Sequence, residues 1–282
     1  LAYLGLYSLQ HRDQESAGIV SSDNGVFHLH KAMGGVSEVF SRPETIDRLT
    51  GDCAIGHTRY STTGASSLIN IQPFLITNRS SNLAVGHNGN LTNAVTLKNN
   101  LDSKGSIFQT TSDTEVILHL AAVSKKKTRL DRICDALSKC KGAFSLVFLT
   151  EDSLVAARDP QGFRPLALGK LGSSWVVASE TCAFDIIGAK YVRDVEPGEV
   201  LEISDKGLKS VFPVKSTRHA YCIFEYIYFA RPDSKVFGEN VDKVRRRLGR
   251  QLAEEHPVDA DIVIGIPDSA NTATLGFSEA SG

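Results

Sequence analysis

Short runs of apolar residues separated by turn residues dominate the first part of the chain. Runs of this kind, bounded by Gly, Asn, Asp or Ser, are typical of β-strands. They predict strands over residues 17–20, 26–30, 52–57, 83–86, 144–150, 154–158, 175–179 and 200–204. Many short strands with only a few helices between them favour an α+β fold.

Helical spacing replaces this pattern in three stretches of the same region. Leu1–Leu9 carries apolar residues on more than one face, which predicts a helix that is buried on several sides. Residues 93–104 form a second predicted helix. Residues 112–124 form a third, because their apolar positions recur at the period of a helix.

The start of the third predicted helix has its own signature. Ser112 precedes Glu115 by three positions, which is the pattern of a capping box and makes Ser112 the predicted N-cap. Asp113 then lies in the first helical turn, where it faces outward near the positive end of the helix dipole. A capping role and a ligand-binding role for Asp113 are compatible, and the sequence leaves both open.

Three further segments are predicted connections. Asp159–Gly162 is a turn, and Glu196–Glu199 is a turn of the kind found in hairpins. Ser179–Phe184 has the sequence of a strand end that enters a helix. We assign no chemistry to this last segment.

The pattern changes again after residues 213–219, where the periodicity lapses. Residues 241–255 predict an amphipathic, basic helix that ends before His256-Pro257. Asp261–Ile266 is a continuous apolar run, as expected for a buried parallel strand, and residues 273–280 predict a following helix. We therefore expect two domains, at residues 1–215 and 216–282. A single parallel strand cannot complete a sheet, so the second domain is expected to be only begun here.

Composition narrows the class of protein. The net charge of −1 argues against nucleic acid or a polybasic membrane surface as a partner. No apolar run is long enough to span a bilayer. The five cysteines show no pairing pattern, which favours reduced thiols and a cytoplasmic protein.

Chemistry-bearing residues gather in three neighbouring segments. Asn88 offers a side-chain amide and Gly89 a backbone N–H that can approach a ligand closely, and together they can stabilise the oxyanion of an acyl-transfer intermediate. Arg59 can bind a carboxylate through two hydrogen bonds, and Asp113 can accept hydrogen bonds from an ammonium group. A ligand with all three groups is an amino acid that carries a side-chain amide. The alternative for such a set is a surface ion pair and a turn.

The order of these segments resembles a known family. They read GHTRYSTTG (residues 56–64), GHNGN (86–90) and SDTE (112–115), and YSLQHRDQESAG (7–18) precedes them. The set is similar to the class II glutamine amidotransferase domain. The string CIFEYIYFARPDS (222–234) narrows the resemblance to the amidophosphoribosyltransferases within that class. Asp13 departs from the family, which usually has glycine there.

The resemblance implies a fold and a reaction. The fold is a four-layer αββα sandwich of the N-terminal-nucleophile type, followed by the start of an α/β phosphoribosyltransferase domain. The reaction is transfer of ammonia from glutamine to phosphoribosyl pyrophosphate, which gives 5-phosphoribosylamine in the first step of purine (IMP) biosynthesis. By the same resemblance the protein is a homo-oligomer, a tetramer.

The resemblance also assigns roles to residues. Arg59 and Asp113 hold the α-groups of glutamine, and Asn88 with Gly89 forms the oxyanion hole. The remaining pocket residues are Arg12 and Thr62, which shape it, and Tyr60, which belongs to the loop that closes over it.

The nucleophile of the resembled family is a cysteine that opens the mature chain and whose own α-amino group acts as the base. Here Leu1 opens the sequence, and no cysteine precedes the His11-Arg12 turn. We therefore expect the nucleophile to lie in a segment before residue 1. Cys53, which precedes the Arg59 segment, is expected to be a small buried strand residue.

Two metal sites follow by resemblance alone. Ser269 would lie near the Mg²⁺ and phosphoribosyl pyrophosphate site, although an N-cap of the next helix is an equally good interpretation. Cys222 would be one ligand of a [4Fe–4S] cluster, with a buried thiol as the alternative. The family's diphosphate-binding loop, two Asp before a Thr-rich segment, does not occur in these residues.

Other functions remain open at this point. One is a related class II amidotransferase that feeds a sugar-phosphate isomerase or an asparagine synthetase domain, against which CIFEYIYFARPDS argues. Another is a catalytically inactive regulatory or structural module.

Overall fold

Two β-sheet layers lie face to face in the computed structural model, which describes residues 1–12, 14–59, 68–78, 81–216 and 218–282. One layer is a six-stranded sheet in the order β12-β11-β7-β6-β5-β4. Its strands are β4 (Phe74–Asn78), β5 (Ser81–Leu91), β6 (Gly142–Leu149), β7 (Ser153–Arg158), β11 (Val200–Ser204) and β12 (Gly207–Val211).

The other layer consists of two three-stranded sheets, in the orders β2-β1-β3 and β10-β8-β9. Their strands are β1 (Ser16–Asp23), β2 (Val26–Met33), β3 (Cys53–Arg59), β8 (Ala167–Leu171), β9 (Ser174–Ala178) and β10 (Lys190–Asp194). Neighbouring strands in both layers pair antiparallel.

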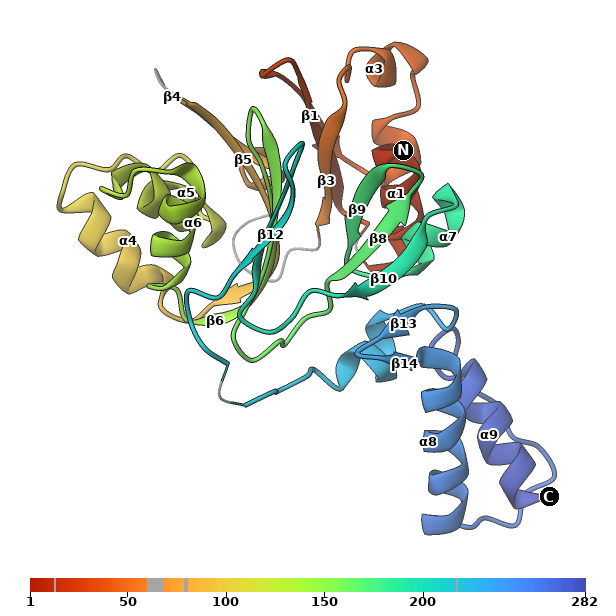
Figure 1. Ribbon diagram of the computed structural model, residues 1–282. Coiled ribbons are helices and arrows are strands. Elements are labelled where there is room, and N and C mark those ends of the chain that lie inside the picture. Colours follow the sequence, from red (N-terminus) through yellow and green to blue (C-terminus); the bar gives the residue numbers. More distant parts are fainter. Residues whose placement is uncertain (13, 60–67, 79–80, 217) are drawn as a thin grey trace.

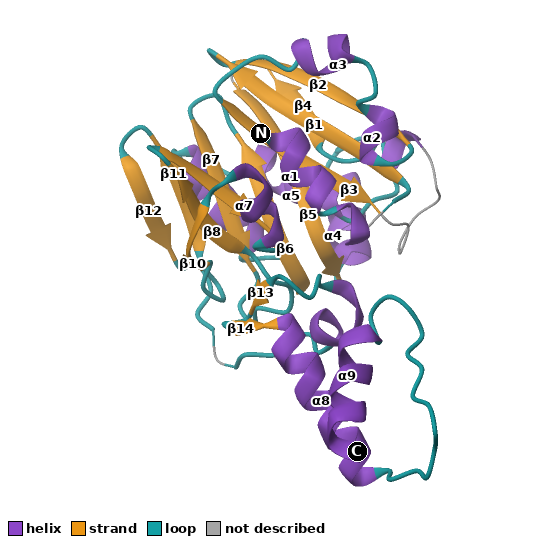
Figure 2. Cartoon of the chain, turned by 90° about the vertical axis from the view of Figure 1, so that its right-hand side faces the viewer, coloured by secondary structure: helices purple, strands orange, loops and turns teal. Residues whose placement is uncertain are grey.

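Helices cover the outer face of each layer, as Figures 1 and 2 show. The six-stranded sheet is covered by α4 (Ala94–Asp102), α5 (Thr114–Val123) and α6 (Arg129–Leu137). The opposite side carries α1 (Ala2–Ser8), α2 (Val36–Val39), α3 (Pro43–Asp47) and α7 (Cys182–Ile187), and the short turn η1 (Gln10–Arg12) follows α1. A second short turn, η2 (Leu68–Asn70), precedes β4, and its Asn70 forms hydrogen bonds with Thr111. The expected four-layer αββα sandwich is confirmed.

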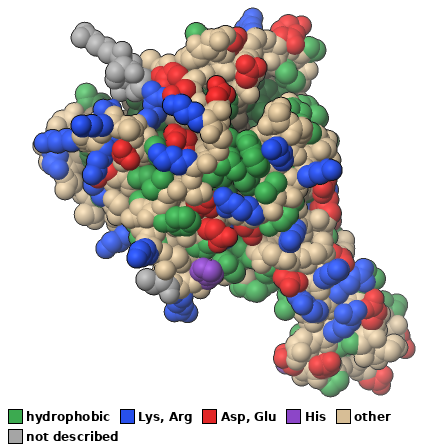
Figure 3. All heavy atoms as spheres, in the orientation of Figure 1, with side chains coloured by type: hydrophobic (Ala, Val, Ile, Leu, Met, Phe, Trp, Pro, Cys, Tyr) green, Lys and Arg blue, Asp and Glu red, His purple; other side chains and the backbone are tan. Residues whose placement is uncertain are grey.

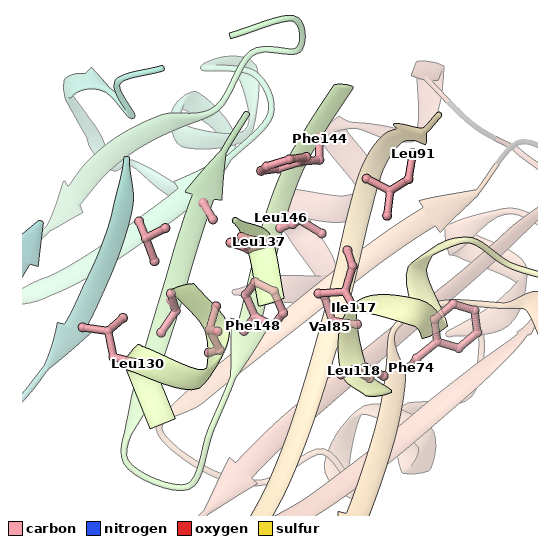
Figure 4. Packing of buried hydrophobic residues seen from close by; sticks show 14 residues of the cluster. Phe74, Val85, Leu91, Ile117, Leu118, Leu130, Leu137, Phe144, Leu146 and Phe148 are labelled. Carbon is pink, nitrogen blue, oxygen red and sulfur yellow. The ribbon is translucent and has the colours of Figure 1, made fainter. Parts of the chain in front are cut away.

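Separate clusters of buried apolar side chains pack between these layers and hold them together. The largest lies between the six-stranded sheet and helices α5 and α6, and includes Ile117 of α5 beside Val85 of β5 (Figure 4), together with Ile133 of α6. A second cluster lies between the two sheet layers and includes Val20 of β1 and Leu149 of β6. The central strands β6 and β7 are buried at consecutive positions because helices cover one face of their sheet and the second sheet layer covers the other, and this explains the unbroken apolar runs at residues 144–150 and 154–158.

A smaller C-terminal part extends from one end of the sandwich (Figure 1). It contains η3 (Glu225–Phe229, a π-helical turn), β13 (Lys235–Val236), β14 (Glu239–Asn240), α8 (Val241–Glu255) and α9 (Asn271–Ser281). The two helices pack closely because a Cβ at Gly249 would lie 1.9 Å from the Ala273 carbonyl oxygen. Basic and acidic side chains mix on this part in Figure 3, and Arg246 and Arg250 of α8 bind Glu279 of α9.

The predicted strand at Asp261–Ile266 is wrong. These residues form no strand, and Ile262, Ile264 and Ile266 are exposed by 73%, 83% and 82%. The physical reason is that an apolar run becomes a strand only beside a partner that satisfies its backbone, and the described residues offer none here.

Three other expectations need correction. The helix Leu1–Leu9 forms but is not buried on several sides, because it lies on the outside of its sheet and leaves Leu1, Leu4 and Tyr7 exposed. The turn at Glu196–Glu199 forms but closes no hairpin, since β10 pairs with β8 and β11 pairs with β7 and β12. Cys53 is half-buried rather than buried.

In the part of the chain that the structure describes, no helix is both long enough and apolar enough to cross a membrane.

Candidate functional site

Strand β5 brings Asn88 and Gly89 to an edge that no described strand covers. Gly89 lies opposite Phe144 of β6. The N–H and C=O of Phe144 point the other way, because Phe144 donates to Asp159 Oδ2 at 3.3 Å and accepts from Asp159 N at 2.8 Å. Gly89 and Phe144 therefore form a non-hydrogen-bonded pair of the antiparallel ladder, in which the backbone N–H and C=O groups of each residue point away from the partner strand. The N–H of Gly89 therefore points away from β6.

On that outer side β4 pairs with β5 only as far as Val85. Past Val85, side chains form hydrogen bonds with the backbone groups of β5 that point in the same direction as those of Gly89. Gln72 Oε1 accepts from His87 N at 2.8 Å, and His57 Nε2 donates to His87 O at 2.8 Å. Two residues past Gly89, Leu91 N donates to Asp113 Oδ2 at 2.7 Å. Gly89 thus lies between two positions whose backbone is already satisfied.

The backbone at this point requires glycine. Gly89 has a φ of +154°, and a Cβ there would lie 2.1 Å from the Ala143 carbonyl oxygen. The absence of a side chain leaves the N–H accessible to a ligand. Asn88 beside it is half-buried, and its side-chain amide makes no hydrogen bond to another described residue.

Asp113 differs from the prediction made for it. Helix α5 begins at Thr114, with Asp113 rather than Ser112 at the N-cap position. The predicted capping box is absent, because Glu115 accepts instead from the backbone N–H groups of Gln109 and Thr110. The Asp113 carboxylate is 13% exposed and faces β5, not outward. The hydrogen bond to Leu91 explains this orientation.

Arg59 is the last residue of β3 and is buried, with 6% of its surface exposed. It pairs with Ser16 of β1, and its carbonyl oxygen accepts from Glu15 N at 3.2 Å. Tyr60 and Thr62, which follow it, lie outside the described residues.

Arg12 lies in a cluster of buried charges. Its guanidinium donates to Glu180, and to both carboxylate oxygens of Glu225 at 2.8 and 2.9 Å. His11 Nε2 also contacts Glu180 at 2.9 Å, and Arg164 donates to Glu225 at 2.9 Å. Both carboxylate side chains are fully buried. This cluster joins η1, the approach to α7 and η3, so it ties the sandwich to the C-terminal part.

The charges of this cluster stabilise one another. Burial alone would raise the pKa of Glu180, but the hydrogen bond from His11 and the charge of Arg12 outweigh it and lower that pKa to about 2. Burial would lower the pKa of Arg12, but Glu225 and Glu180 outweigh it and raise that pKa. Sequence reasoning assigned Arg12 to the glutamine pocket. The contacts described here are with the two carboxylates, and the pocket role stays a prediction.

Burial makes four of the cysteines poor nucleophiles. It raises the pKa of Cys53, Cys134 and Cys182 to about 11 and that of Cys140 to about 12. A thiol reacts as its thiolate, so these side chains are inert at neutral pH. Cys222 is half-buried, with its Sγ 3.8 Å from Arg164 Nη1.

The metal predictions find no complete site in the described residues. These contain no group of three or more His, Cys, Asp or Glu side chains that could hold a metal ion. Cys222 is therefore at most one of the four thiolates that a cluster needs. Ser269 lies in the turn before α9, whose N-cap position is Ala270, so the N-cap interpretation of Ser269 is wrong by one residue.

Sequence reasoning missed three contributors to the site. His57 and Gln72 satisfy the backbone of His87, and Glu180 holds the His11-Arg12 turn. His57 stood within the quoted string GHTRYSTTG, so its position beside Arg59 was a usable signal. Gln72 and Glu180 carried none, because their partners are distant in sequence.

Comparison with known proteins shows which proteins the chain is similar to. A family model described as a glutamine amidotransferase domain matches residues 57–185, which include the end of β3 and all of β5 and α5. An amidophosphoribosyltransferase of Bacillus subtilis is 48% identical over the whole of this chain. Over its whole length, then, the chain is similar to amidophosphoribosyltransferases. A chloroplastic amidophosphoribosyltransferase of Vigna aconitifolia is 51% identical, again over the whole chain.

Solved structures show the same similarity. The glutamine phosphoribosylpyrophosphate amidotransferase of B. subtilis, in complex with ADP and GMP, superimposes with a TM-score of 0.95 over 99% of this chain. The amidophosphoribosyltransferase relatives are longer: the chain spans 59% of the B. subtilis sequence and 58% of the Vigna sequence.

Proposed function

We propose that the protein containing this chain is an amidophosphoribosyltransferase. It releases ammonia from the side-chain amide of glutamine and transfers it to phosphoribosyl pyrophosphate. The products are glutamate, pyrophosphate and 5-phosphoribosylamine, at the first step of purine (IMP) biosynthesis. In enzyme terms it is a glycosyltransferase with a glutaminase half-reaction.

The observation that carries this proposal is the open edge of β5. The Gly89 N–H and the Asn88 amide are two donors on adjacent residues, next to a segment whose other backbone groups are satisfied by His57, Gln72 and Asp113. Such a pair suits the negative oxygen that forms when a nucleophile adds to an amide carbonyl. Donors that are fixed in advance need no reorganisation as the charge develops.

The remaining pocket residues take the roles that the family resemblance implies. Arg59 binds the α-carboxylate of glutamine and Asp113 its α-ammonium group. Arg12 and Thr62 shape the pocket, and Tyr60 belongs to the loop that closes over it. We assign the nucleophile to none of the five cysteines of this chain, since burial keeps four protonated and Cys222 lies in the C-terminal part.

Several finer features belong to the same proposal. Residues 1–215 form the glutamine amidotransferase domain and residues 216–282 the start of a phosphoribosyltransferase domain. Mg²⁺ is required in the transferase step, with Ser269 near it. Cys222 is one ligand of a [4Fe–4S] cluster that the described residues do not complete. The protein is a cytoplasmic homo-oligomer, a tetramer.

One assay separates this function from its rivals. The protein that contains this chain is incubated with amide-labelled ¹⁵N-glutamine, phosphoribosyl pyrophosphate and Mg²⁺, and glutamate and pyrophosphate are measured. Equal amounts of both, with the label in the amine product, are expected. Glutamate without pyrophosphate would indicate another class II amidotransferase. Neither product would indicate a regulatory or structural module.

The two metal assignments have their own tests. Ser269→Ala should shift the Mg²⁺ dependence of the transferase step, and an unchanged dependence would remove Ser269 from the metal site. Protein purified without oxygen should contain about four irons per chain. Colourless, iron-free protein with full activity would make Cys222 an ordinary half-buried thiol.

A further inference from the structure

His57 bridges the two sheet layers at the candidate oxyanion site. It belongs to β3, in the layer opposite to β5, and its Nε2 lies 2.8 Å from the carbonyl oxygen of His87. Gly86 lies beside the ring, since a Cβ there would be in van der Waals contact with Cδ2 of His57, at 3.7 Å. His57 therefore fixes the backbone of the residue directly before Asn88.

The surroundings of the His57 ring favour its neutral form with the proton on Nε2. A carbonyl oxygen only accepts, so Nε2 carries the proton. Nδ1 is buried and has no hydrogen-bond partner among the described residues, so an added proton there would be an unpaired buried N–H. Burial accordingly lowers the pKa of His57 to about 4, and the charges of His87 and Arg59 act in the same direction.

The His87 ring begins a second chain of contacts, which runs through Thr114 and Asp113 to the backbone of Leu91. His87 Nδ1 lies 2.9 Å from Thr114 Oγ1, which lies 3.3 Å from Asp113 Oδ1. The other Asp113 oxygen accepts from Leu91 N. If Thr114 donates to Asp113, the His87 Nδ1–H is the donor to Thr114. Asn88-Gly89-Asn90 is thus held at both ends, at residue 87 by His57 and at residue 91 by Asp113.

We propose that His57 is a positioning residue that sets the Gly89 N–H and the Asn88 amide at the place where the oxyanion forms. This rests on the proposed function of the site. His57 does not touch the substrate in this role. It acts through the His87 carbonyl, and its loss lets the β5 edge relax while the Arg59 end of the pocket stays intact.

The consequence is a separation of kinetic effects. Loosened oxyanion donors reduce stabilisation of the transition state, which lowers kcat, whereas binding of the α-groups of glutamine is unaffected. Removal of one hydrogen bond of ordinary strength corresponds to about a tenfold effect. A general loss of folding would instead reduce the amount of active protein and leave KM and kcat per active site unchanged.

The experiment compares two variants in the full protein. His57→Phe keeps a planar ring and loses the donor, and His57→Gln places an amide N–H near the position of Nε2. We expect His57→Phe to lower the kcat for glutamine hydrolysis about tenfold, with KM within about twofold, and His57→Gln to recover most of this loss. Active sites are counted by titration with a covalent glutamine analogue.

Two outcomes would overturn the proposal. One is an unchanged kcat per active site in His57→Phe, and the other is equal loss in both variants. Asn88→Ala is measured in parallel, because it tests the oxyanion site itself. If Asn88→Ala is impaired and His57→Phe is not, only the positioning role fails. If neither is impaired, the proposed function of the site fails with it.

Discussion

Asp113 Oδ2 accepts a hydrogen bond from Leu91 N at 2.7 Å, and the carboxylate therefore faces β5 instead of solvent. The residue proposed to receive the ammonium group of glutamine is thus also a support for the strand that carries the oxyanion donors. Its two oxygens face different partners, because Oδ2 accepts from the Leu91 N–H and Oδ1 from the Thr114 hydroxyl at 3.3 Å.

This division predicts the behaviour of Asp113→Asn. The amide oxygen can still accept from Leu91, but the negative charge that attracts the ammonium group is gone. We expect the KM for glutamine to rise about tenfold or more, equivalent to at least about 1.4 kcal/mol, with a change in unfolding free energy below about 1 kcal/mol. Steady-state kinetics and urea denaturation measure the two effects.

The control for that variant is Asp102→Asn, on the exposed end of α4. It should leave both quantities unchanged. A normal KM in Asp113→Asn would mean that Asp113 supports β5 and does not bind the substrate.

Arg59→Lys tests the other end of glutamine. A lysine keeps the positive charge but cannot form the two parallel hydrogen bonds that an arginine makes to a carboxylate. We expect KM to rise about tenfold and kcat to change much less. Arg48→Lys, at an exposed position after α3, is the matched control. A fall in kcat with an unchanged KM would exclude the carboxylate-binding role.

The buried charge cluster predicts a stability effect. In Glu180→Gln the guanidinium of Arg12 and the imidazole of His11 lose their shared charged partner in a buried site. We expect unfolding free energy to fall by about 3–5 kcal/mol, measured by denaturation of the full protein. The exposed pair of Glu239 with Arg247 provides the comparison, and Glu239→Gln should cost less than about 1 kcal/mol. Similar losses in both variants would contradict the account of the cluster.

His57 predicts a pH dependence of stability. Its pKa is about 4 in the folded protein and about 6.5 in an unfolded chain, so the unfolded state binds more protons between these values. Stability is therefore complete above pH 6.5 and falls as the pH decreases toward 4, by at most about 1.4 kcal/mol per pH unit from this group. Burial lowers the pKa of His87 as well, and His87 acts in the same direction.

The measurement is denaturation at several pH values between 4 and 7, with His57→Gln as the reference because it cannot titrate. The wild-type curve should be steeper than that of the variant. Parallel curves would mean that His57 is not the buried, neutral group that its contacts describe.

Local patterns in the sequence predicted elements that pack locally. Residues 200–204 and 241–255 match β11 and α8 at both ends, because alternation or helical spacing is complete within each segment. The sequence could not reveal β4, β8, β10 and β12, whose short runs are ordered by their neighbours. The run Asp261–Ile266 shows the opposite case, in which strand propensity is present and the pairing strand is not among the described residues.

The candidate site divides in the same way. The sequence proposes Asn88, Gly89, Arg59 and Asp113 because their residue types carry the chemistry, and their roles stay predictions. The direction of the Gly89 N–H could not be predicted, because it depends on the register with Phe144 and on where β4 stops. The orientation of Asp113 depends on a hydrogen bond across 22 positions, to Leu91, which no local pattern encodes.

The central claim is that the open edge of β5 stabilises an oxyanion, and the kcat of Asn88→Ala for glutamine hydrolysis tests it most directly. Removal of one such donor should lower kcat by about 10²–10³-fold, with little change in KM. Asn99→Ala, on the exposed surface of α4, is the matched control and should behave as wild type. An Asn88→Ala protein that folds, binds glutamine and keeps its full kcat would contradict the claim and leave the turn at Asn88-Gly89 a purely structural feature.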